Sequence, residues 1–284
     1  MEAVKIAVIG AASVDICGKP FMPPRMKDSN PGKVSQSFGG VGRNIAGVLK
    51  NLGAEVSLIV AVGDDENGRA IYDDCVKSGL DMSLSLTLPG ETSAVYLYIS
   101  DEGGDMQLAV ADMAIAYRLD PEYLAKILPE LNACDAVVID GNLSNKAIAF
   151  AADNIRVPLY ADAVSCAKAK KLEPVFPALR AFKPNLLEAQ YLTGTDSANA
   201  AADALLATGI KRVFISLGSE GMLACEGSER ILVPGENVEV KSLSGCGDAA
   251  AAGVIYADLC GMSLYDAAAF ANHMGALAAA GVYR

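Results

Sequence analysis

Short apolar segments alternate with amphipathic ones along most of this 284-residue chain, and this alternation constrains the fold more than any other feature. Residues 5–10 (KIAVIG) and 136–140 have the length and continuous apolar character of strands buried on both faces. From Asn44 onward, apolar residues recur at the spacing of an amphipathic helix, which Gly53 ends. Strands that alternate with helices predict an α/β protein with a mostly parallel central sheet.

The same patterns predict the remaining elements of the alternation. Expected strands lie at 56–62, 158–162, 180–183 and 212–217, with short antiparallel strands near 222–225 and 230–233, and expected helices lie at about 66–77, 248–260 and 263–280.

Residues 93–113 break the alternation, because two strand-like runs at 94–99 and 106–110 flank a hairpin-type turn at 101–105. A hairpin inserted between strand–helix units does not easily join a parallel sheet. We expect it to pair with the irregular stretch after residue 14. The product would be a small accessory sheet, a lid over the C-terminal ends of the strands, where ligands bind in such folds.

Composition narrows the partners. A net charge of −11 argues against nucleic acid and anionic membrane surfaces, which select for basic faces. Charged or turn residues interrupt every apolar run before it could span a bilayer, and the N-terminal residues lack the pattern of an export signal, so we expect a cytoplasmic protein. The seven cysteines are scattered without metal-ligand spacing, which indicates neither a zinc site nor a disulfide framework.

The segment Gly245-Cys246-Gly247-Asp248 places a carboxylate at the start of an Ala-rich helix. Glycines let the backbone turn sharply, and the first-turn N–H groups of a helix favour an anion such as phosphate. A carboxylate beside such a site could take the proton of an attacking hydroxyl while N–H groups stabilise developing charge. The simpler interpretation is a tight turn followed by an ordinary acidic helix start.

Four motifs in order resemble the ribokinase-like (PfkB) carbohydrate kinases: GGVGRN (39–44), KPNLLE (183–188), SLGSEG (216–221) and GCGD (245–248). The resemblance implies a single 1–284 domain with a three-layer α/β/α fold and a β-sheet lid formed by about 14–37 and 92–113. Within the family, GAASVD (10–15), the hairpin tail 104–113 and DAVS (162–165) are most similar to pseudouridine kinases. Ribokinase, fructokinase and purine-nucleoside kinases remain alternatives.

The resemblance assigns the sugar end of a site, where Asp15 would accept hydrogen bonds from ribose hydroxyls. The implied substrate-binding residues are Ser13, Asp15, Gly39, Gly40, Asn44 and Asp112. The alternative for Asp15 is a helix or turn cap. No Lys-Ser or Lys-Thr follows the glycines at 39–42, so they do not form a Walker phosphate loop.

The resemblance also assigns the nucleotide end, with ATP and Mg²⁺ as cofactors. Implied ATP-binding residues are Asn185, Ser216, Gly218, Gly221 and Asn272, and Asn185 with Glu188 would help hold Mg²⁺. Asn185 and Glu188 also fit a helix cap with its capping-box acid, and both interpretations can hold together. We expect His273, beside Asn272, to be structural.

The implied reaction is in-line transfer of the ATP γ-phosphoryl group to the 5′-hydroxyl of a ribosyl nucleoside, with pseudouridine favoured. Asp248 would be the base, and Gly245, Cys246 and Gly247 would supply N–H groups. A non-catalytic nucleoside- or sugar-binding relative is the alternative from another class. A homodimer through the lid is also expected, because exposed strand edges are usually covered.

Two departures from the family pattern lie beside this motif. Ser242-Leu243 replaces the usual Asp-Thr, which leaves open the monovalent-cation (K⁺) site that many members build there. Cys246 replaces a small residue, and its place at a helix N-terminus suggests the hypothesis of a reactive thiol with a lowered pKa.

Overall fold

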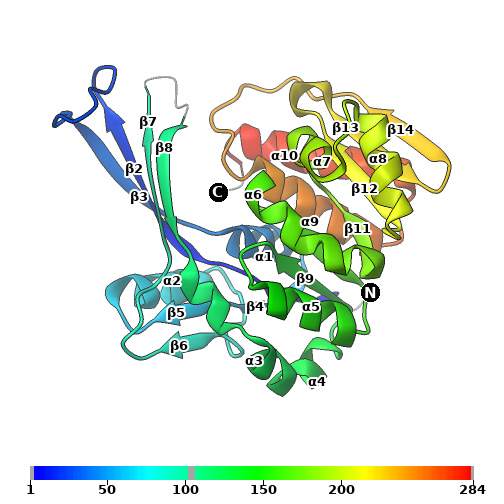
Figure 1. Cartoon of the computed structure of the whole chain (residues 1–284), viewed down its shortest axis with the longest axis horizontal. Helices are drawn as coiled ribbons and strands as arrows, with labels where there is room; N and C mark the ends of the chain where they lie inside the picture. Colours follow the sequence, from blue (N-terminus) through cyan, green and yellow to red (C-terminus); the bar gives the residue numbers. More distant parts are fainter. Residues whose placement is uncertain (1–2, 102–105, 283–284) are drawn as a thin grey trace.

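An eight-stranded, mostly parallel sheet lies at the centre of the computed structural model, which describes residues 3–101 and 106–282 (Figure 1). The strand order is β14 (Glu229–Val233), β13 (Met222–Glu226), β12 (Arg212–Ser216), β11 (Leu179–Phe182), β10 (Leu159–Asp162), β9 (Ala136–Asp140), β1 (Lys5–Ile9), β4 (Glu55–Ile59). The six strands from β12 to β4 are parallel, and β13 and β14 extend the sheet by antiparallel pairing. The predicted parallel sheet is therefore confirmed.

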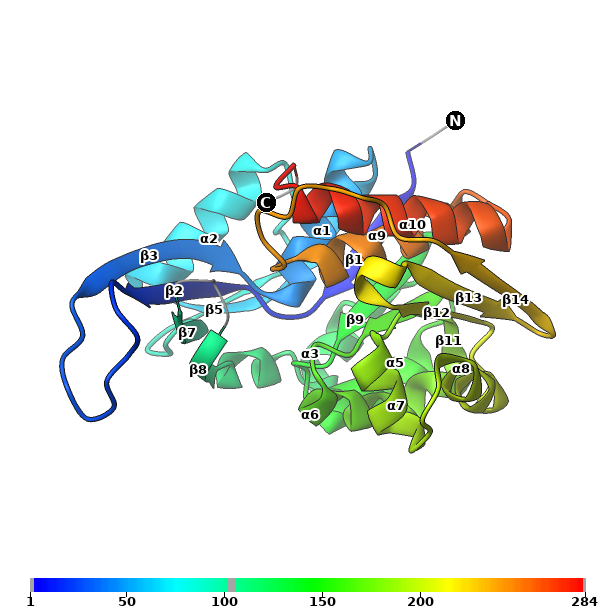
Figure 2. The ribbon, with the colours of Figure 1, turned by 90° about the horizontal axis from the view of Figure 1, so that it is seen from above.

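Helices cover both faces of this sheet (Figure 2). One face carries α1 (Val41–Asn51), α2 (Glu66–Lys77), α9 (Cys246–Leu259) and α10 (Leu264–Ala279). The other face carries α3 (Pro121–Lys126), α4 (Leu128–Leu131), α5 (Asn145–Asn154), α6 (Cys166–Ala169), α7 (Leu186–Thr193) and α8 (Ala198–Ala207). Short 3₁₀ helices span Ala114–Arg118, Lys170–Ala178 and Gly218–Glu220. Ile6 and Val8 of β1 enter the first core, and Ala7 and Ile9 enter the second. This alternation explains why the strands read as unbroken apolar runs and confirms three layers.

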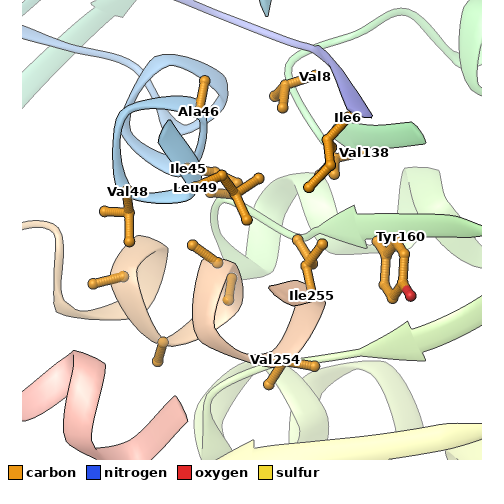
Figure 3. Close-up of a cluster of buried hydrophobic side chains, with 14 of the residues drawn as sticks. Ile6, Val8, Ile45, Ala46, Val48, Leu49, Val138, Tyr160, Val254 and Ile255 are labelled. Carbon is orange, nitrogen blue, oxygen red and sulfur yellow. The ribbon is translucent and has the colours of Figure 1, made fainter. Parts of the chain in front are cut away.

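The core beneath α1 and α9 fixes the ends of these two helices (Figure 3). Ile45 and Leu49 of α1 and Ile255 of α9 pack with Ile6 of β1, and all four side chains are buried. Burial of each such side chain stabilises the fold by about 1.5–3 kcal/mol. At the crossing of α9 with α10, a Cβ on Gly253 would lie only 2.8 Å from the Cα of Ala271, so a glycine permits the close approach.

A second sheet stands apart from the first and has the order β3 (Gly32–Gly39), β2 (Ser13–Pro20), β7 (Val95–Ser100), β8 (Met106–Asp112) (Figure 1). The hairpin strands β7 and β8 thus pair with the stretch after residue 14, as predicted. Cross-strand register places Asp15, Ser37, Tyr96 and Ala111 in one row, and therefore on one face.

The structure differs from the sequence-based prediction in three elements. The single strand expected at 56–62 is divided into β4 and β5 (Ala61–Gly63), because β5 leaves the large sheet to pair with β6 (Leu86–Leu88). Helix α1 begins at Val41 rather than near Asn44, since its first turn is glycine-containing and carries no apolar periodicity. Strand β2 extends into the stretch read as irregular. Most of the predicted turn 101–105 lies outside the described residues.

None of the helices within residues 3–101 and 106–282 combines the length and the apolar character needed to cross a membrane.

Candidate active site

Ionisable side chains gather where β9, β10 and β11 end. Asp140 is the last residue of β9, Asp162 is the last of β10, and Lys183 follows β11 directly. All three side chains are buried. Parallel α/β sheets bind their ligands at the carboxyl ends of the strands, so this cluster lies where a site is expected.

Asp248 meets this cluster from the first turn of α9. The helix begins after Gly245, whose φ of 81° lies in the left-handed region that favours glycine. Asn44 of α1 donates a hydrogen bond from Nδ2 to Oδ2 of Asp248 at 2.7 Å. The two motifs 204 residues apart are therefore joined by one contact, and the packing of α1 on α9 holds it in place.

The surroundings of Asp248 favour its neutral form. Burial and the nearby Asp162 carboxylate together raise the pKa of Asp248 to about 7, although Asn44 and Lys183 act in the opposite direction. A carboxylate that titrates near neutral pH is suited to accept a proton from a hydroxyl.

Asp140 and Asp162 have backbone partners. Asp140 Oδ2 accepts hydrogen bonds from the N–H groups of Ala11 at 2.9 Å and Gly42 at 3.0 Å, which ties the end of β1 to the start of α1. Asp162 Oδ1 accepts the N–H of Val164 at 2.7 Å. Asp140 therefore orients the loops around the site, and sequence patterns did not single it out.

Asp15 lies on the second sheet, on the row shared with Tyr96. Its Oδ1 accepts a hydrogen bond from Ser13 Oγ at 2.7 Å, and burial raises the pKa of the Asp15 carboxyl. Ser13 is fully buried, so it positions Asp15 from behind. A Cβ on Gly39 would collide with the Asp15 carboxylate, which explains why this position needs glycine.

Gly40 and Asn44 make contacts within the protein: Gly40 allows a close backbone approach, and Asn44 hydrogen-bonds Asp248. Gly40 has φ of 97°, and a Cβ there would collide with the Ala11 carbonyl. Asn44 uses its amide N–H on Asp248, and its Oδ1 accepts from Arg43 Nη1 at 3.3 Å. Arg43 also pairs with Asp74. Asn44 was predicted to contact a sugar hydroxyl, and the structure places it as the residue that orients Asp248.

Asp112 is placed apart from Asp15. Asp112 pairs with Val95, and Val95 pairs with Val14. This row of paired residues is adjacent to the row that contains Asp15. Because successive residues of a strand point to opposite faces, Asp112 lies on the other face of the second sheet. Its side chain is exposed.

This geometry can be compared with known proteins. A family model described as "pfkB family carbohydrate kinase" matches residues 3–282. The chain belongs to the pfkB family of carbohydrate kinases. It is 32% identical to a pseudouridine kinase of Escherichia coli over 96% of this chain and 90% of that protein. This pfkB kinase also resembles a solved carbohydrate kinase from Agrobacterium tumefaciens, with 28% identity and a TM-score of 0.83 over 96% of this chain and 90% of that one. It shares its fold with a ribokinase from Thermotoga maritima, with 17% identity and a TM-score of 0.86 over 98% of this chain and 93% of that one.

The predicted nucleotide-side residues of this kinase meet at the ends of β11 and β12. Asn185 Oδ1 accepts the N–H of Glu188 at 2.8 Å, and Glu188 Oε2 accepts the N–H of Asn185 at 3.0 Å, which is a complete capping box at the start of α7. The backbones of Ser216 and Asn185 form an isolated parallel β-bridge. Gly218 and Gly221 follow Ser216 in the turn before β13, both with positive φ. Asn185, Glu188 and Ser216 are thus brought together.

Asn272 lies on α10 and reaches the turn that holds Gly221 through Pro234, because a Cβ on Gly221 would lie 2.7 Å from the Pro234 carbonyl carbon. Its Nδ2 donates to the Pro234 carbonyl at 3.1 Å, which holds the segment after β14 against α10. His273 Nδ1 lies 2.9 Å from Glu236 Oε2 on the same segment, so both residues have structural contacts here.

Membership of a kinase family implies ATP and a divalent metal ion, and two buried carboxylates fit such an ion. Both side chains are buried, and burial raises the pKa of Glu188, which the negative charge of Asp162 raises further. A cation would relieve their repulsion. Within the described residues, no cluster of three or more His, Cys, Asp or Glu side chains is arranged to hold a metal. One or two carboxylates plus substrate phosphates are what Mg²⁺ commonly uses.

The hypothesis of a reactive Cys246 is wrong in its physical basis. Burial raises the pKa of the Cys246 thiol, and the adjacent Asp248 charge raises it further, against a smaller lowering by a backbone hydrogen bond. The thiol is directed to the Ser242 carbonyl, with Sγ 3.6 Å from that oxygen. Cys246 is therefore less nucleophilic than an exposed cysteine.

Proposed function

We propose that this kinase transfers the γ-phosphoryl group of ATP to the 5′-hydroxyl of a ribosyl nucleoside, with pseudouridine as the leading substrate. The observation that carries the proposal is the Asn44–Asp248 contact, which joins the two family motifs and holds a carboxylate with a pKa of about 7 at the start of α9. The identity to an E. coli pseudouridine kinase supports the choice of substrate.

Asp15 and the second sheet supply the acceptor end in this proposal. Tyr96 and Tyr98 lie on the same face as Asp15, with ring centroids 5.6 Å apart. Flat aromatic surfaces beside a diol-binding carboxylate suit a planar base attached to a ribose, whereas a free sugar has no base to stack. Ser13 and Gly39 hold Asp15, and the sheet acts as the lid.

The proposed reaction uses residues from both sheets. Asp248 accepts the proton of the 5′-hydroxyl as its oxygen attacks the γ-phosphorus, and the backbone N–H groups of residues 245–247 face the phosphoryl oxygens. Asn185 and Glu188, together with the buried Asp162 carboxylate, would hold Mg²⁺, which would neutralise phosphate charge. Closure of the lid excludes water that would otherwise hydrolyse ATP.

A coupled assay for ADP release tests the proposal with pseudouridine, inosine, adenosine, cytidine, ribose and fructose as acceptors. We expect the highest kcat/KM with pseudouridine and a 5′-phosphorylated product. Faster turnover of a free hexose would overturn the nucleoside assignment, and ADP release with none of the acceptors would favour the non-catalytic alternative.

We also propose that a second copy of the chain covers the outer face of the lid. Val34, Leu108 and Val110 on this face are each at least 60% exposed. Their rows alternate with the row of Asp15, so pairing through them leaves the Asp15 face free. Sedimentation of the wild type and of Leu108→Lys tests this, with a dimer expected for the first and a monomer for the second. A wild-type monomer would contradict it.

A further inference from the structure

Lys183 is the first residue of the KPNLLE motif at 183–188, but the motif assigned it no role in the site. It follows β11 and precedes Pro184 and the capping box of Asn185, so its backbone is held on both sides. The residue is only 6% exposed. A Cβ placed on Gly247 would lie 3.9 Å from the Lys183 ammonium, so the side chain is aimed at the first turn of α9.

The surroundings of Lys183 are acidic, yet its ammonium is unpaired within the described residues. Lys183 lowers the pKa of Asp162, Glu188 and Asp248, so it lies among all three carboxylates. No carboxylate oxygen of the described residues lies within ion-pair distance of it, and no hydrogen bond joins it to another described group. Every fully buried side-chain nitrogen or oxygen of the described residues has a hydrogen-bond partner, so the unpaired Lys183 ammonium is reached by solvent although the rest of its side chain is buried. Its donors are therefore open to a ligand that enters the site.

Two neighbouring lysines show the contrast. Lys168 Nζ donates to Asn142 Oδ1 at 2.5 Å, and Lys171 Nζ donates to the Gly141 carbonyl at 2.7 Å. Both are therefore engaged with the loop after β9. Lys183 is the buried lysine of this edge whose donors remain available.

From these observations we propose that Lys183 is a catalytic residue whose ammonium binds the terminal phosphoryl group of ATP, between the start of α9 and Glu188. The inference rests on the proposed kinase reaction at this site. The ammonium supplies a positive charge to the phosphoryl oxygens beside the first turn of α9.

Lys183 gives and takes no proton in this step. The bond from the acceptor oxygen to the γ-phosphorus forms, the bond from that phosphorus to the β–γ bridging oxygen breaks with its electron pair leaving on ADP, and the hydroxyl proton passes to Asp248. The charge of Lys183 stabilises the equatorial oxygens throughout and favours the ionised form of Asp248 against the burial that opposes it. Stabilisation of this kind commonly contributes about 10²–10³ in kcat.

Calorimetric titration without any acceptor separates this proposal from the substrate assignment. Binding of the non-hydrolysable analogue AMP-PNP and of ADP, each with Mg²⁺, is measured for the wild type, Lys183→Met and Lys211→Met. Lys211 is an exposed lysine at the opposite, N-terminal end of β12 and serves as the matched control. We expect Lys183→Met to bind AMP-PNP at least tenfold more weakly while ADP affinity stays within threefold, because only AMP-PNP carries the terminal group.

Kinetics supply the second readout. With an accepted substrate, Lys183→Met should lower kcat by about 10²–10³ with the acceptor KM within threefold. The acid limb of the pH profile should move to higher pH, since Asp248 would face Asp162 and Asp140 with only Asn44 opposing them. Unchanged AMP-PNP affinity, equal weakening of both nucleotides, or a kcat like that of Lys211→Met would overturn the proposal. Absence of turnover in the wild type would defeat the proposed function alone, because the titrations still decide the role of Lys183.

If Lys183→Met does not fold, Lys183→Gln carries the same titrations, with Lys183→Arg, which keeps the positive charge, as its control. Loss of the preference for AMP-PNP in Lys183→Gln, but not in Lys183→Arg, supports the proposal. Retention of that preference in Lys183→Gln overturns it.

Discussion

Helix α9 carries an aspartate near each end, and the two have opposite environments. Asp258, near the C-terminal end, accepts hydrogen bonds from Tyr160 at 2.6 Å, from Arg180 at 2.9 Å and from Arg212 at 2.8 Å. Burial alone would raise the pKa of Asp258, but these hydrogen bonds hold it below its ordinary value. Asp248, near the N-terminal end, has one side-chain hydrogen bond and a pKa raised to about 7.

The difference separates a structural carboxylate from a reactive one on the same helix. The partners of Asp258 come from β10, β11 and β12, so they fasten the helix to the sheet. Asp248 is left among other carboxylates, where its ionised form is unfavourable and its affinity for a proton is high. The firmly held end keeps the reactive end in position.

The largest expected effect is on kcat and comes from a substitution of Asp248, at the N-terminal end of α9. Asp248→Asn should lower kcat by about 10³-fold or more, because the amide cannot accept the hydroxyl proton, while acceptor binding stays nearly intact. The coupled ADP assay measures turnover, and calorimetry measures acceptor affinity. Wild-type turnover in this variant would show that Asp248 is not the base.

The second effect breaks the structural end. Asp258→Ala should lower the free energy of unfolding by about 3 kcal/mol, because the buried Arg212 loses the buried one of its two carboxylate partners and keeps only the more exposed Glu226. Urea denaturation checks this, with Lys211→Met as the control. The folded variant should keep kcat within a few-fold of the wild type, and a large fall in kcat without a loss of stability would contradict the division of roles.

The third effect sharpens the comparison through pH. Asp248 acts as a base only when ionised, so kcat/KM should fall as the pH drops through about 7. Asn44→Ala removes a hydrogen bond that lowers the pKa of Asp248, so its acid limb should move to higher pH. Initial rates between pH 5.5 and 9 measure the acid limb of the wild type and of Asn44→Ala. Acid limbs at the same pH in both proteins would show that Asn44 does not lower the pKa of Asp248.

The smallest effect concerns stability against pH, where the two ends have opposite signs. Asp248 has a raised pKa, so ionising it costs stability as the pH rises from its unfolded value toward 7, and Asp248→Asn should melt higher than the wild type at pH 8 by a few degrees. The lowered pKa of Asp258 contributes stability above its unfolded pKa, and that contribution is lost in acid. Scanning calorimetry of Asp248→Asn at pH 5 and pH 8 tests the first linkage, and an equal offset from the wild type at both values would refute it. The contribution of Asp258 is tested with Asp258→Asn at pH 3 and pH 5, where an equal offset would refute the second linkage.

Local patterns predicted the elements whose signals are continuous in the chain. The apolar run of β9 and the helix Glu66–Lys77 end where glycine, charge and periodicity indicated. Patterns failed where pairing decides the outcome. The run 56–62 is one apolar segment in sequence, but its last residues pair with β6 in another sheet.

The candidate site shows the same limit. Motif spacing identified Asp15, Asn44, Glu188 and Asp248 as candidates, but their contacts required the fold. Lys183 is the first residue of the KPNLLE motif. Nothing in the sequence indicated that its ammonium lies beside Gly247.

By itself, the sequence determined the α/β class, the order of the elements and the family motifs, because these follow from periodicity and from short runs of residues with local conformational preferences. Only the tertiary structure decided that Asn44 orients Asp248, that Cys246 is not activated, and that Asp248 and Asp258 differ in acidity. The physical reason is that a pKa depends on burial and on charges within several ångströms, and here those charges come from strands far apart in the chain.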